Sequence, residues 1–164
     1  MISIDIENIA LGEISLKLEA VDFAQSSSTY YLSIDNFLMP EDDNTYKVLV
    51  NLNKLLSKWL TCLKSFNENN YKWVYLPFDF ADEYMGFLRV SMLPNDNFQL
   101  DYGYTEEIKG YTQSPSQMEC IIDNKFNNYE TLSDSIISGK KDIFENIEKI
   151  KKSIEDCITQ LHEE

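Results

Sequence analysis

Histidine and arginine are the scarcest functional residues in this chain of 164 residues. It contains one histidine, His162, close to the C-terminal end, and one arginine, Arg89. A Ser-His-Asp triad, a Cys-His dyad and a histidine-rich zinc site each need an ordered histidine, whereas the ends of chains are commonly poorly ordered. The scarcity therefore argues against these three kinds of site.

Cysteine, glycine and long apolar runs are limited as well. Cys62, Cys120 and Cys157 are widely spaced and form no CxxC pair, which is typical of small buried residues in a reducing compartment. The five glycines form no GxxxxGK loop for phosphates, and no apolar run approaches the roughly 20 residues that span a bilayer. The first twenty residues also lack the basic start and apolar block of a signal peptide. We therefore expect a cytoplasmic protein without a resident metal or cofactor.

The chain has few positive charges. Its 28 acidic residues outnumber its 14 basic ones, which gives a formal net charge of −14. A field of this sign repels nucleic acids and anionic membranes and favours encounters with basic proteins. Acidity also keeps many proteins soluble, so a solubilising surface and an acidic binding face both remain open. We expect no nucleic-acid partner and no membrane partner.

Hydrophobic periodicity predicts strands first. Apolar residues alternate with polar ones in "ISIDIE", "EISLKLEA" and "TYYLSIDNF", and the third of these segments places Tyr30, Leu32 and Ile34 on one face. The polar segment "AQSSS" has the length of a hairpin connection between the last two. Three antiparallel strands with one solvated face are therefore expected at the N-terminal end.

Two amphipathic helices are predicted. A stripe that includes Val48, Leu52, Leu55 and Trp59 indicates a helix over about residues 44–66. Isoleucines at spacings of four and three from Ile143 onward indicate a second helix over about residues 140–161. Its seam spans fewer than three heptads, which favours docking on its own domain, although a homodimer through this helix is an alternative.

Further strands are expected in the middle of the chain. "YKWVYL" reads as one strand, and "GFLRVSML" and "FQLDYGYT" flank the turn-forming "PNDN", so residues 86–105 are predicted to form a hairpin. Pro77 is expected to end the first strand or lie at a sheet edge, and Gly86 to give backbone freedom where the chain turns. The whole chain, residues 1–164, is predicted to be a single α+β domain. Its mainly antiparallel sheet, of about six strands, is packed by the helix at about 44–66 and accompanied by the long C-terminal helix.

Asp79, Asp82 and Glu83 form the one cluster of acids that invites a catalytic interpretation. Paired carboxylates can act as general acid and base in a hydrolase or hold Mg²⁺. No basic clamp or phosphate loop accompanies them, however, and acids next to a strand commonly form turns and caps. On that interpretation Asp79 caps a local turn and Arg89 pairs with one of the three acids.

A recognition surface is the other interpretation of this region. Tyrosines supply contact area at low entropic cost, and acids steer a basic partner toward the surface. Aromatic residues on strands are also common in cores, so burial of these rings remains an alternative. The expected partner-binding residues are Asp79, Asp82, Glu83, Tyr84, Tyr102, Tyr104, Glu106 and Glu107.

The stretch "YLPFDFADEYMGFLRV", followed by "LDYGYTEEIKGYTQSPSQ", resembles a recurring pattern in small uncharacterised bacterial proteins. The resemblance covers residues 73–117, and some of these proteins resemble immunity proteins of polymorphic toxin systems. It implies a cytoplasmic inhibitor that binds a toxin, and it brings no catalytic residues. We therefore expect a non-enzymatic binding protein that inhibits a basic toxin domain, with a carboxylate-dependent hydrolase and a structural or regulatory homodimer as alternatives.

Overall fold

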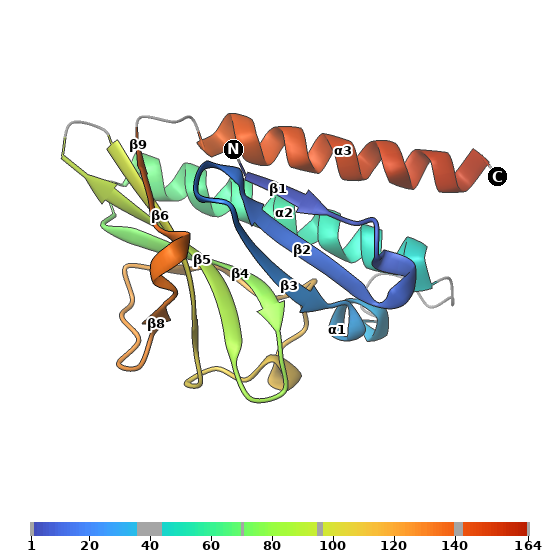
Figure 1. Ribbon diagram of the computed structural model, residues 1–164, viewed down its shortest axis with the longest axis horizontal. Helices are drawn as coiled ribbons and strands as arrows, with labels where there is room; N and C mark the ends of the chain where they lie inside the picture. Colours follow the sequence, from blue (N-terminus) through green and yellow to red (C-terminus); the bar gives the residue numbers. More distant parts are fainter. Residues whose placement is uncertain (1, 36–43, 70, 95–96, 140–142, 164) are drawn as a thin grey trace.

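Two antiparallel sheets and two long helices enclose one hydrophobic core, as the computed structural model shows (Figure 1). The structure describes residues 2–35, 44–69, 71–94, 97–139 and 143–163. This arrangement confirms the predicted α+β class. Within the described ranges, no helix is long and apolar enough to cross a bilayer.

The larger sheet has six strands in the order β7-β4-β5-β6-β8, and β9 also pairs with β6. The long central strands are β4 (Trp73–Phe80), β5 (Met85–Leu93) and β6 (Asn97–Thr105), and the short ones are β7 (Ile121–Ile122), β8 (Glu130–Thr131) and β9 (Ile137–Gly139). β5 and β6 pair from Met85 opposite Thr105 to Leu93 opposite Asn97, which confirms the predicted hairpin.

The smaller sheet contains the N-terminal strands in the order β1-β2-β3, namely β1 (Ile2–Asp5), β2 (Glu13–Leu18) and β3 (Phe23–Ser28). The first two strands are as predicted. The third prediction was wrong, because "AQSSS" lies within β3 and is not a connection, and Tyr30–Ile34 forms a short helix, α1. Every residue of β3 pairs with β2, so backbone hydrogen bonds hold a strand whose side chains are mostly polar.

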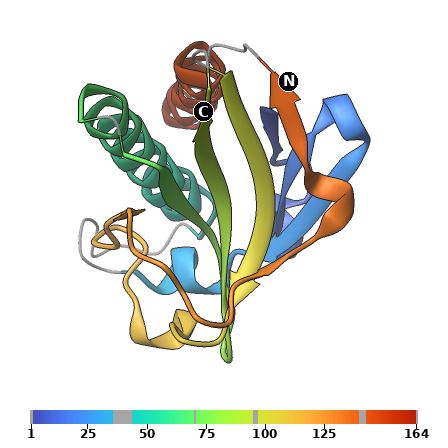
Figure 2. The same ribbon diagram turned by 90° about the vertical axis from the view of Figure 1, so that its left-hand side faces the viewer.

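Both long helices lie close to their predicted positions. They are α2 (Asn44–Glu68) and α3 (Ile143–Glu163). The apolar stripe of α2 is buried, with Leu52, Leu55 and Trp59 fully enclosed, and α3 packs on α2 and on β1. Figure 2 shows α2 along one side of the six-stranded sheet and the three-stranded sheet along the other. The described residues also include four short 3₁₀ turns, at Ile9–Leu11, Glu19–Val21, Gly110–Thr112 and Ser133–Ser135.

Pro77 does not end its strand but takes the other predicted position, a sheet edge, because among the described residues β7 pairs with β4 at Val74 and Tyr75 alone. β4 continues through it to Phe80, and Pro77 pairs with Phe87 of β5. The carbonyl of Pro77 accepts a hydrogen bond from Trp59 Nε1 of α2 at 2.9 Å. A proline is compatible with such a position, because no ladder hydrogen bond needs its missing N–H.

Candidate functional site

The eight residues predicted to bind a partner lie at one end of the six-stranded sheet. The β4–β5 turn carries Asp82, Glu83 and Tyr84, and the pairing of Met85 with Thr105 brings the end of β6 beside this turn. This end is at the bottom of Figure 1. The eight residues differ in exposure: Asp82, Glu83, Glu106 and Glu107 are exposed, Tyr84 and Tyr104 are half-buried, and Asp79 and Tyr102 are buried.

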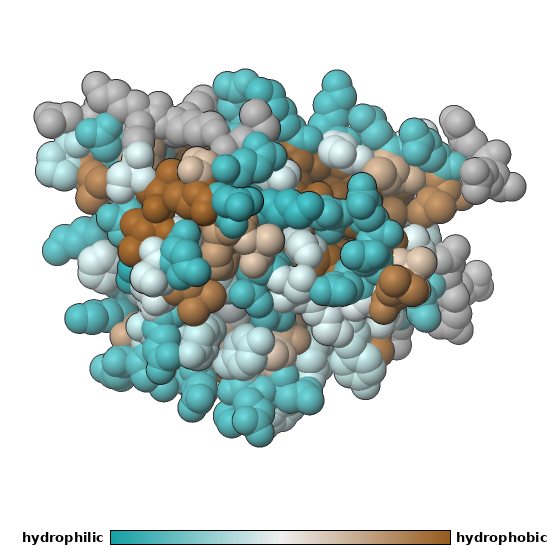
Figure 3. Space-filling model, in the orientation of Figure 1, coloured by the Kyte–Doolittle hydropathy of each residue, from teal (hydrophilic) through white to brown (hydrophobic). Residues whose placement is uncertain are grey.

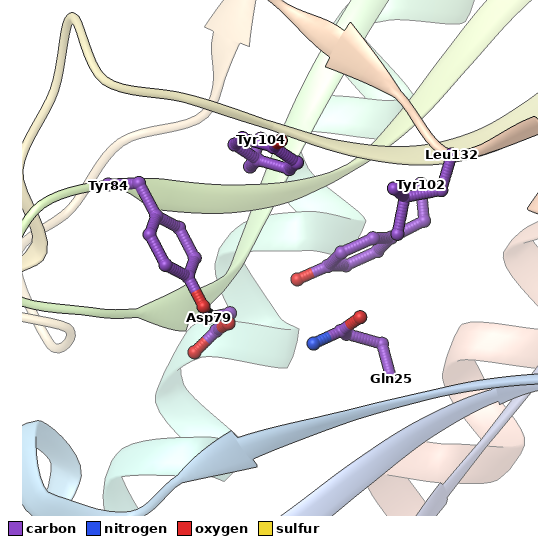
Figure 4. A pocket seen from close by; sticks show the side chains of 6 residues that line it. All are labelled: Gln25, Asp79, Tyr84, Tyr102, Tyr104 and Leu132. Carbon is purple, nitrogen blue, oxygen red and sulfur yellow. Dashed lines mark hydrogen bonds between the residues drawn. The ribbon is translucent and has the colours of Figure 1, made fainter.

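A cavity of about 200 Å³ lies between β3 and the larger sheet (Figure 4). Its lining, which we call the Asp79 cavity, consists of Gln25, Asp79, Tyr84, Tyr102, Tyr104 and Leu132. Four of these residues belong to the predicted set. Gln25 and Leu132 do not, since the segment that contains Gln25 was interpreted as a connection.

A β-bulge directs Asp79 into the cavity. The β4–β5 register shifts between Pro77 and Asp79, so that Pro77 lies opposite Phe87 and Asp79 lies opposite Gly86. In an unbroken strand, Asp79 and Pro77 would share a face, because side chains alternate with a period of two. The bulge instead places Asp79 on the face of Gly86 and Tyr104, which pair with each other.

The carboxylate of Asp79 joins the two sheets. It is only 4% exposed, and it accepts hydrogen bonds from Ser27 Oγ of β3 at 2.7 Å and from Tyr84 Oη at 3.1 Å. Burial raises the pKa of Asp79, and the two hydrogen bonds oppose this effect. Asp79 therefore does not cap a turn, as the alternative interpretation expected, but is a buried acid at the wall of a cavity.

Tyr102 points its hydroxyl into the same cavity (Figure 4). The side chain is 2% exposed, and its oxygen has no hydrogen-bond partner among the described residues. Gly86 provides the room for this hydroxyl, because a Cβ atom at Gly86 would lie 2.1 Å from Tyr102 Oη and 2.8 Å from Asp79 Cβ. Gly86 does not have the positive φ angle that turns require, so its role is space and not the predicted backbone freedom.

Tyr84 and Tyr104 form the outer wall of the cavity. Their ring centroids are 5.5 Å apart and their planes are inclined by 56°. Tyr104 donates its hydroxyl to Glu130 Oε2 at 2.5 Å, outside the cavity, and therefore contributes its ring alone. Burial and the charge of Asp79 raise the pKa of Tyr84 to about 12, so this hydroxyl is protonated at neutral pH.

Further tyrosines surround the β4–β5 turn. Tyr31 of α1 donates its hydroxyl to Asp82 Oδ1, and this bond raises the pKa of Tyr31 to about 12. Tyr30 is 59% exposed beside it, and Tyr111 is 61% exposed. The turn that contains Tyr111 is tied to the β4–β5 turn through Gly110, whose N–H donates to the carbonyl of Ala81 at 2.7 Å. We call the surface formed by these side chains the acid–tyrosine end: Tyr30, Tyr31, Asp82, Glu83, Tyr84, Tyr104, Glu106, Glu107 and Tyr111.

The serine-proline-serine segment fixes α1 at this end. Asp35, directly after α1, accepts hydrogen bonds from Ser114 Oγ at 2.8 Å, from the Ser116 N–H at 2.7 Å and from Ser116 Oγ at 3.0 Å. Asn51 of α2 donates to the carbonyl of Leu32 at 2.7 Å, within α1 itself. These bonds hold Tyr30 and Tyr31 beside the β4–β5 turn, so the motif has a structural role there.

The three acids of the hydrolase hypothesis do not share one site. Asp79 alone lines the cavity, whereas Asp82 and Glu83 are exposed on the turn. Within the described part of the chain, no group of three or more histidine, cysteine or acidic residues is arranged to hold a metal ion.

Arg89 pairs with Asp101 and not with an acid of the turn, contrary to prediction. Its Nε and Nη2 atoms donate to Asp101 Oδ2 at 3.2 and 3.0 Å. Its guanidinium lies 4.9 Å from the ring centroid of Tyr129. Asp101 is fully buried, so this ion pair neutralises a carboxylate inside the fold and leaves the Asp79 cavity without a cation from Arg89.

Comparison with known proteins does not show to which family this chain belongs. No protein-family model, no curated protein and no solved structure matches the chain significantly, so the function is inferred from the acid–tyrosine end and the Asp79 cavity themselves.

Proposed function

We propose that this is a non-enzymatic, cytoplasmic binding protein that captures a basic protein through its acid–tyrosine end, as an immunity-type inhibitor occludes a basic toxin domain. The observation that carries the proposal is the gathering of exposed acids and partly exposed tyrosines at one end of the six-stranded sheet. These residues come from α1, the β4–β5 turn and the end of β6.

The acids would govern the rate of association. Glu83 and Glu106 are exposed, and neither accepts a hydrogen bond from a described residue, so both carboxylates are available to a partner. The net charge of −14 adds a long-range attraction for a basic surface. Side chains at this end appear hydrophilic or of intermediate hydropathy in Figure 3, which is typical of the polar rim of a protein–protein interface.

The tyrosines would hold the complex. Tyr30 and Tyr111 expose more than half of their surface at 59% and 61%, a high value for large rings. Tyrosine is enriched among residues that dominate binding energies, because it combines a broad apolar face with a polar tip. Their hydroxyls can bond to a partner while the rings become buried.

The two alternatives receive less support. A hydrolase that uses Asp79, Asp82 and Glu83 would need these carboxylates around one substrate, and only Asp79 lines the cavity. A homodimer through α3 would need a free apolar seam, but Ile143, Ile147 and Ile154 are at most 3% exposed within the chain's own core. Sedimentation of the full chain separates the dimer from the monomer.

The proposal predicts that a toxin-like protein is encoded beside this gene, and the C-terminal domain of that protein is the partner to test. We expect a tight complex by titration calorimetry that weakens as salt is raised. Glu83→Gln combined with Glu106→Gln should lower the association rate at least threefold. As a matched control, Glu148→Gln with Asp156→Asn removes the same charge from exposed positions on α3, at the opposite end of the molecule, and should leave most of the rate intact.

Two outcomes would overturn the proposed function. The first is the absence of binding at low salt between the two purified proteins. The second is an equal effect of the two charge-matched pairs, since this would mean that net charge alone, and not the acid–tyrosine end, governs association.

A further inference from the structure

We propose that the Asp79 cavity receives the guanidinium group of an arginine side chain, which the basic partner inserts past the rings of Tyr84 and Tyr104. The source of the arginine rests on the proposed function, whereas the chemistry of the cavity does not. The inference stands on four features of the cavity, which are the charge of its lining, an unpaired buried hydroxyl, the aromatic rings at its entrance and its size.

The charge of the residues that line the cavity favours a positively charged ligand. Asp79 is the one ionisable acid among the six lining residues, and none of the six is basic. An ionised carboxylate can accept about four hydrogen bonds, and Asp79 accepts two from described residues, Ser27 and Tyr84. The remaining acceptor positions are open to a donor that carries positive charge.

The hydroxyl of Tyr102 supplies the second observation. A buried hydroxyl without a partner costs about 1–3 kcal/mol, so such a group needs an explanation in a folded protein. Gly86 leaves the space in which this oxygen lies, since any Cβ at that position would collide with it. A phenolic oxygen accepts hydrogen bonds, and a donor placed against Asp79 would lie within the same cavity as Tyr102 Oη.

The rings at the entrance favour the same ligand. Tyr84 and Tyr104 are half-buried, and their mutual inclination of 56° leaves two aromatic surfaces at the mouth of the cavity. Cations are attracted to the faces of aromatic rings, and this attraction grows when water is excluded. Arginine combines such stacking with five donors in a planar arrangement, whereas lysine offers a compact and strongly hydrated charge.

The size of the cavity limits the ligand to a side chain or a similarly small group. Its volume of about 200 Å³ is below the roughly 300–1,000 Å³ of sites for drug-sized molecules. Tyr84 and Tyr104 also belong to the acid–tyrosine end, so a partner docked there could place one arginine in the cavity. The inference therefore assigns an anchoring point to the proposed interface.

A direct test uses Nα-acetyl-arginine amide as the probe and NMR of protein with ¹³C-labelled tyrosine rings as the readout. We expect saturable shifts of the Tyr84 and Tyr102 signals, with a dissociation constant on the order of 1–10 mM. Nα-acetyl-citrulline amide has nearly the same shape without the charge and should bind at least tenfold more weakly. The absence of saturation, equal binding of citrulline, or tighter binding of Nα-acetyl-lysine amide would each overturn the proposal.

Two substitutions locate the probe. Asp79→Asn should weaken binding at least tenfold and Tyr102→Phe at least threefold, whereas Asp156→Asn on α3 makes the same chemical change at an exposed position outside the cavity and should have no effect. Tyr102→Phe keeps the test decisive if Asp79→Asn does not fold, because phenylalanine occupies the same buried space. Unchanged probe binding in Tyr102→Phe would overturn the proposal.

The partner assay separates failure of this inference from failure of the proposed function. If Asp79→Asn loses the probe but binds the basic partner as tightly as the wild type does, the arginine does not come from the partner. The inference is then overturned while the proposed function stands. If the chain binds the probe but no basic partner, the function fails and the cavity is a site for a free guanidinium compound.

Discussion

The hydroxyl of Tyr102 affects the stability of the free protein and the proposed binding of a ligand in opposite directions. Its ring packs against Phe23 of β3, with centroids 5.8 Å apart, and contributes to the core. Its hydroxyl lies buried without a described partner, which lowers the stability of the free protein. If Tyr102 only packed in the core, its ring would suffice and its hydroxyl oxygen would not be needed.

Removing the hydroxyl therefore gives the first prediction. Tyr102→Phe should raise the free energy of unfolding by about 1 kcal/mol, because it removes an unsatisfied polar group and keeps the ring. Tyr129→Phe is the matched control, since Tyr129 donates its hydroxyl to the carbonyl of Phe87 at 3.3 Å and should lose stability by about 0.5–1.5 kcal/mol. Urea denaturation measures both values, and a loss of stability in Tyr102→Phe would contradict the prediction.

Asp79 gives a prediction about pH. Burial raises its pKa in the folded state above the ordinary value of 3.8, so folding favours the protonated form. The stability that this protonation contributes is fully present below about pH 3.8 and is lost as the pH rises through the folded-state pKa. Asparagine stays neutral throughout. The stability of Asp79→Asn relative to the wild type, measured by denaturation, should therefore be higher near pH 7 than near pH 4.

A matched variant isolates the effect of burial in this experiment. Asp156 is exposed on α3, so Asp156→Asn makes the same chemical change without burial and is the reference for Asp79→Asn at each pH. The other acids titrate in all three proteins and largely cancel in the differences. A constant difference for Asp79→Asn would mean that its carboxylate is well solvated in the folded protein.

The residues of the site could be predicted only in part from the sequence. Asp79, Tyr84, Tyr102 and Tyr104 can be identified from the sequence because they belong to a region that is rich in tyrosines and acids. Gln25 was missed because its strand was not recognised. The pairing of Arg89 with Asp101 was within reach, because a hairpin turning at about residue 95 places these two residues opposite each other.

At the scale of elements, the serine-rich strand β3 shows where hydrophobic periodicity fails. "AQSSS" has no apolar alternation, so it was interpreted as a connection. Backbone pairing with β2 and the bond from Ser27 to Asp79 replace the usual burial of apolar side chains. The alternation of Tyr30, Leu32 and Ile34 was equally misleading, since α1 buries Leu32 and exposes the other two.

The bulge in β4 was also beyond prediction from the sequence. A proline argues against a central strand in any prediction that is based on residue propensities. Pro77 nevertheless fits into β4, because no hydrogen bond between strands requires an N–H at its position. The shift of register after it turns Asp79 toward Tyr104. Since the cavity depends on this shift, its existence could be known only from the structure.

The docking of α3 gives a prediction for an element. Ile147 is fully buried against the core, whereas Leu161, on the same predicted seam, is 39% exposed. Ile147→Ala should lower the free energy of unfolding by about 2–5 kcal/mol, because it leaves a cavity, and Leu161→Ala should change it by less than about 0.5 kcal/mol. Chemical denaturation measures both. Equal effects would mean that Leu161 is covered, as it would be in a dimer through α3.

At the scale of the whole molecule, the excess of negative charge affects folding and binding in opposite directions. The formal net charge of −14 means that the folded chain repels itself at neutral pH. The same charge attracts a basic partner, and the exposed acids of the acid–tyrosine end bring part of it to one surface. Salt screens both effects, since the Debye length falls from about 30 Å at 0.01 M to about 8 Å at 0.15 M.

Salt should therefore stabilise the fold while it slows association. Raising NaCl from about 0.01 M to about 0.15 M is expected to raise the melting temperature by about 2–4 °C, which corresponds to about 1 kcal/mol for a chain of this size. The same change should lower the association rate with the basic partner. Differential scanning calorimetry and stopped-flow fluorescence measure the two responses. A lower melting temperature would mean that exposed ion pairs such as Lys149–Glu145, and not the net repulsion, dominate the salt-sensitive electrostatics of the folded state.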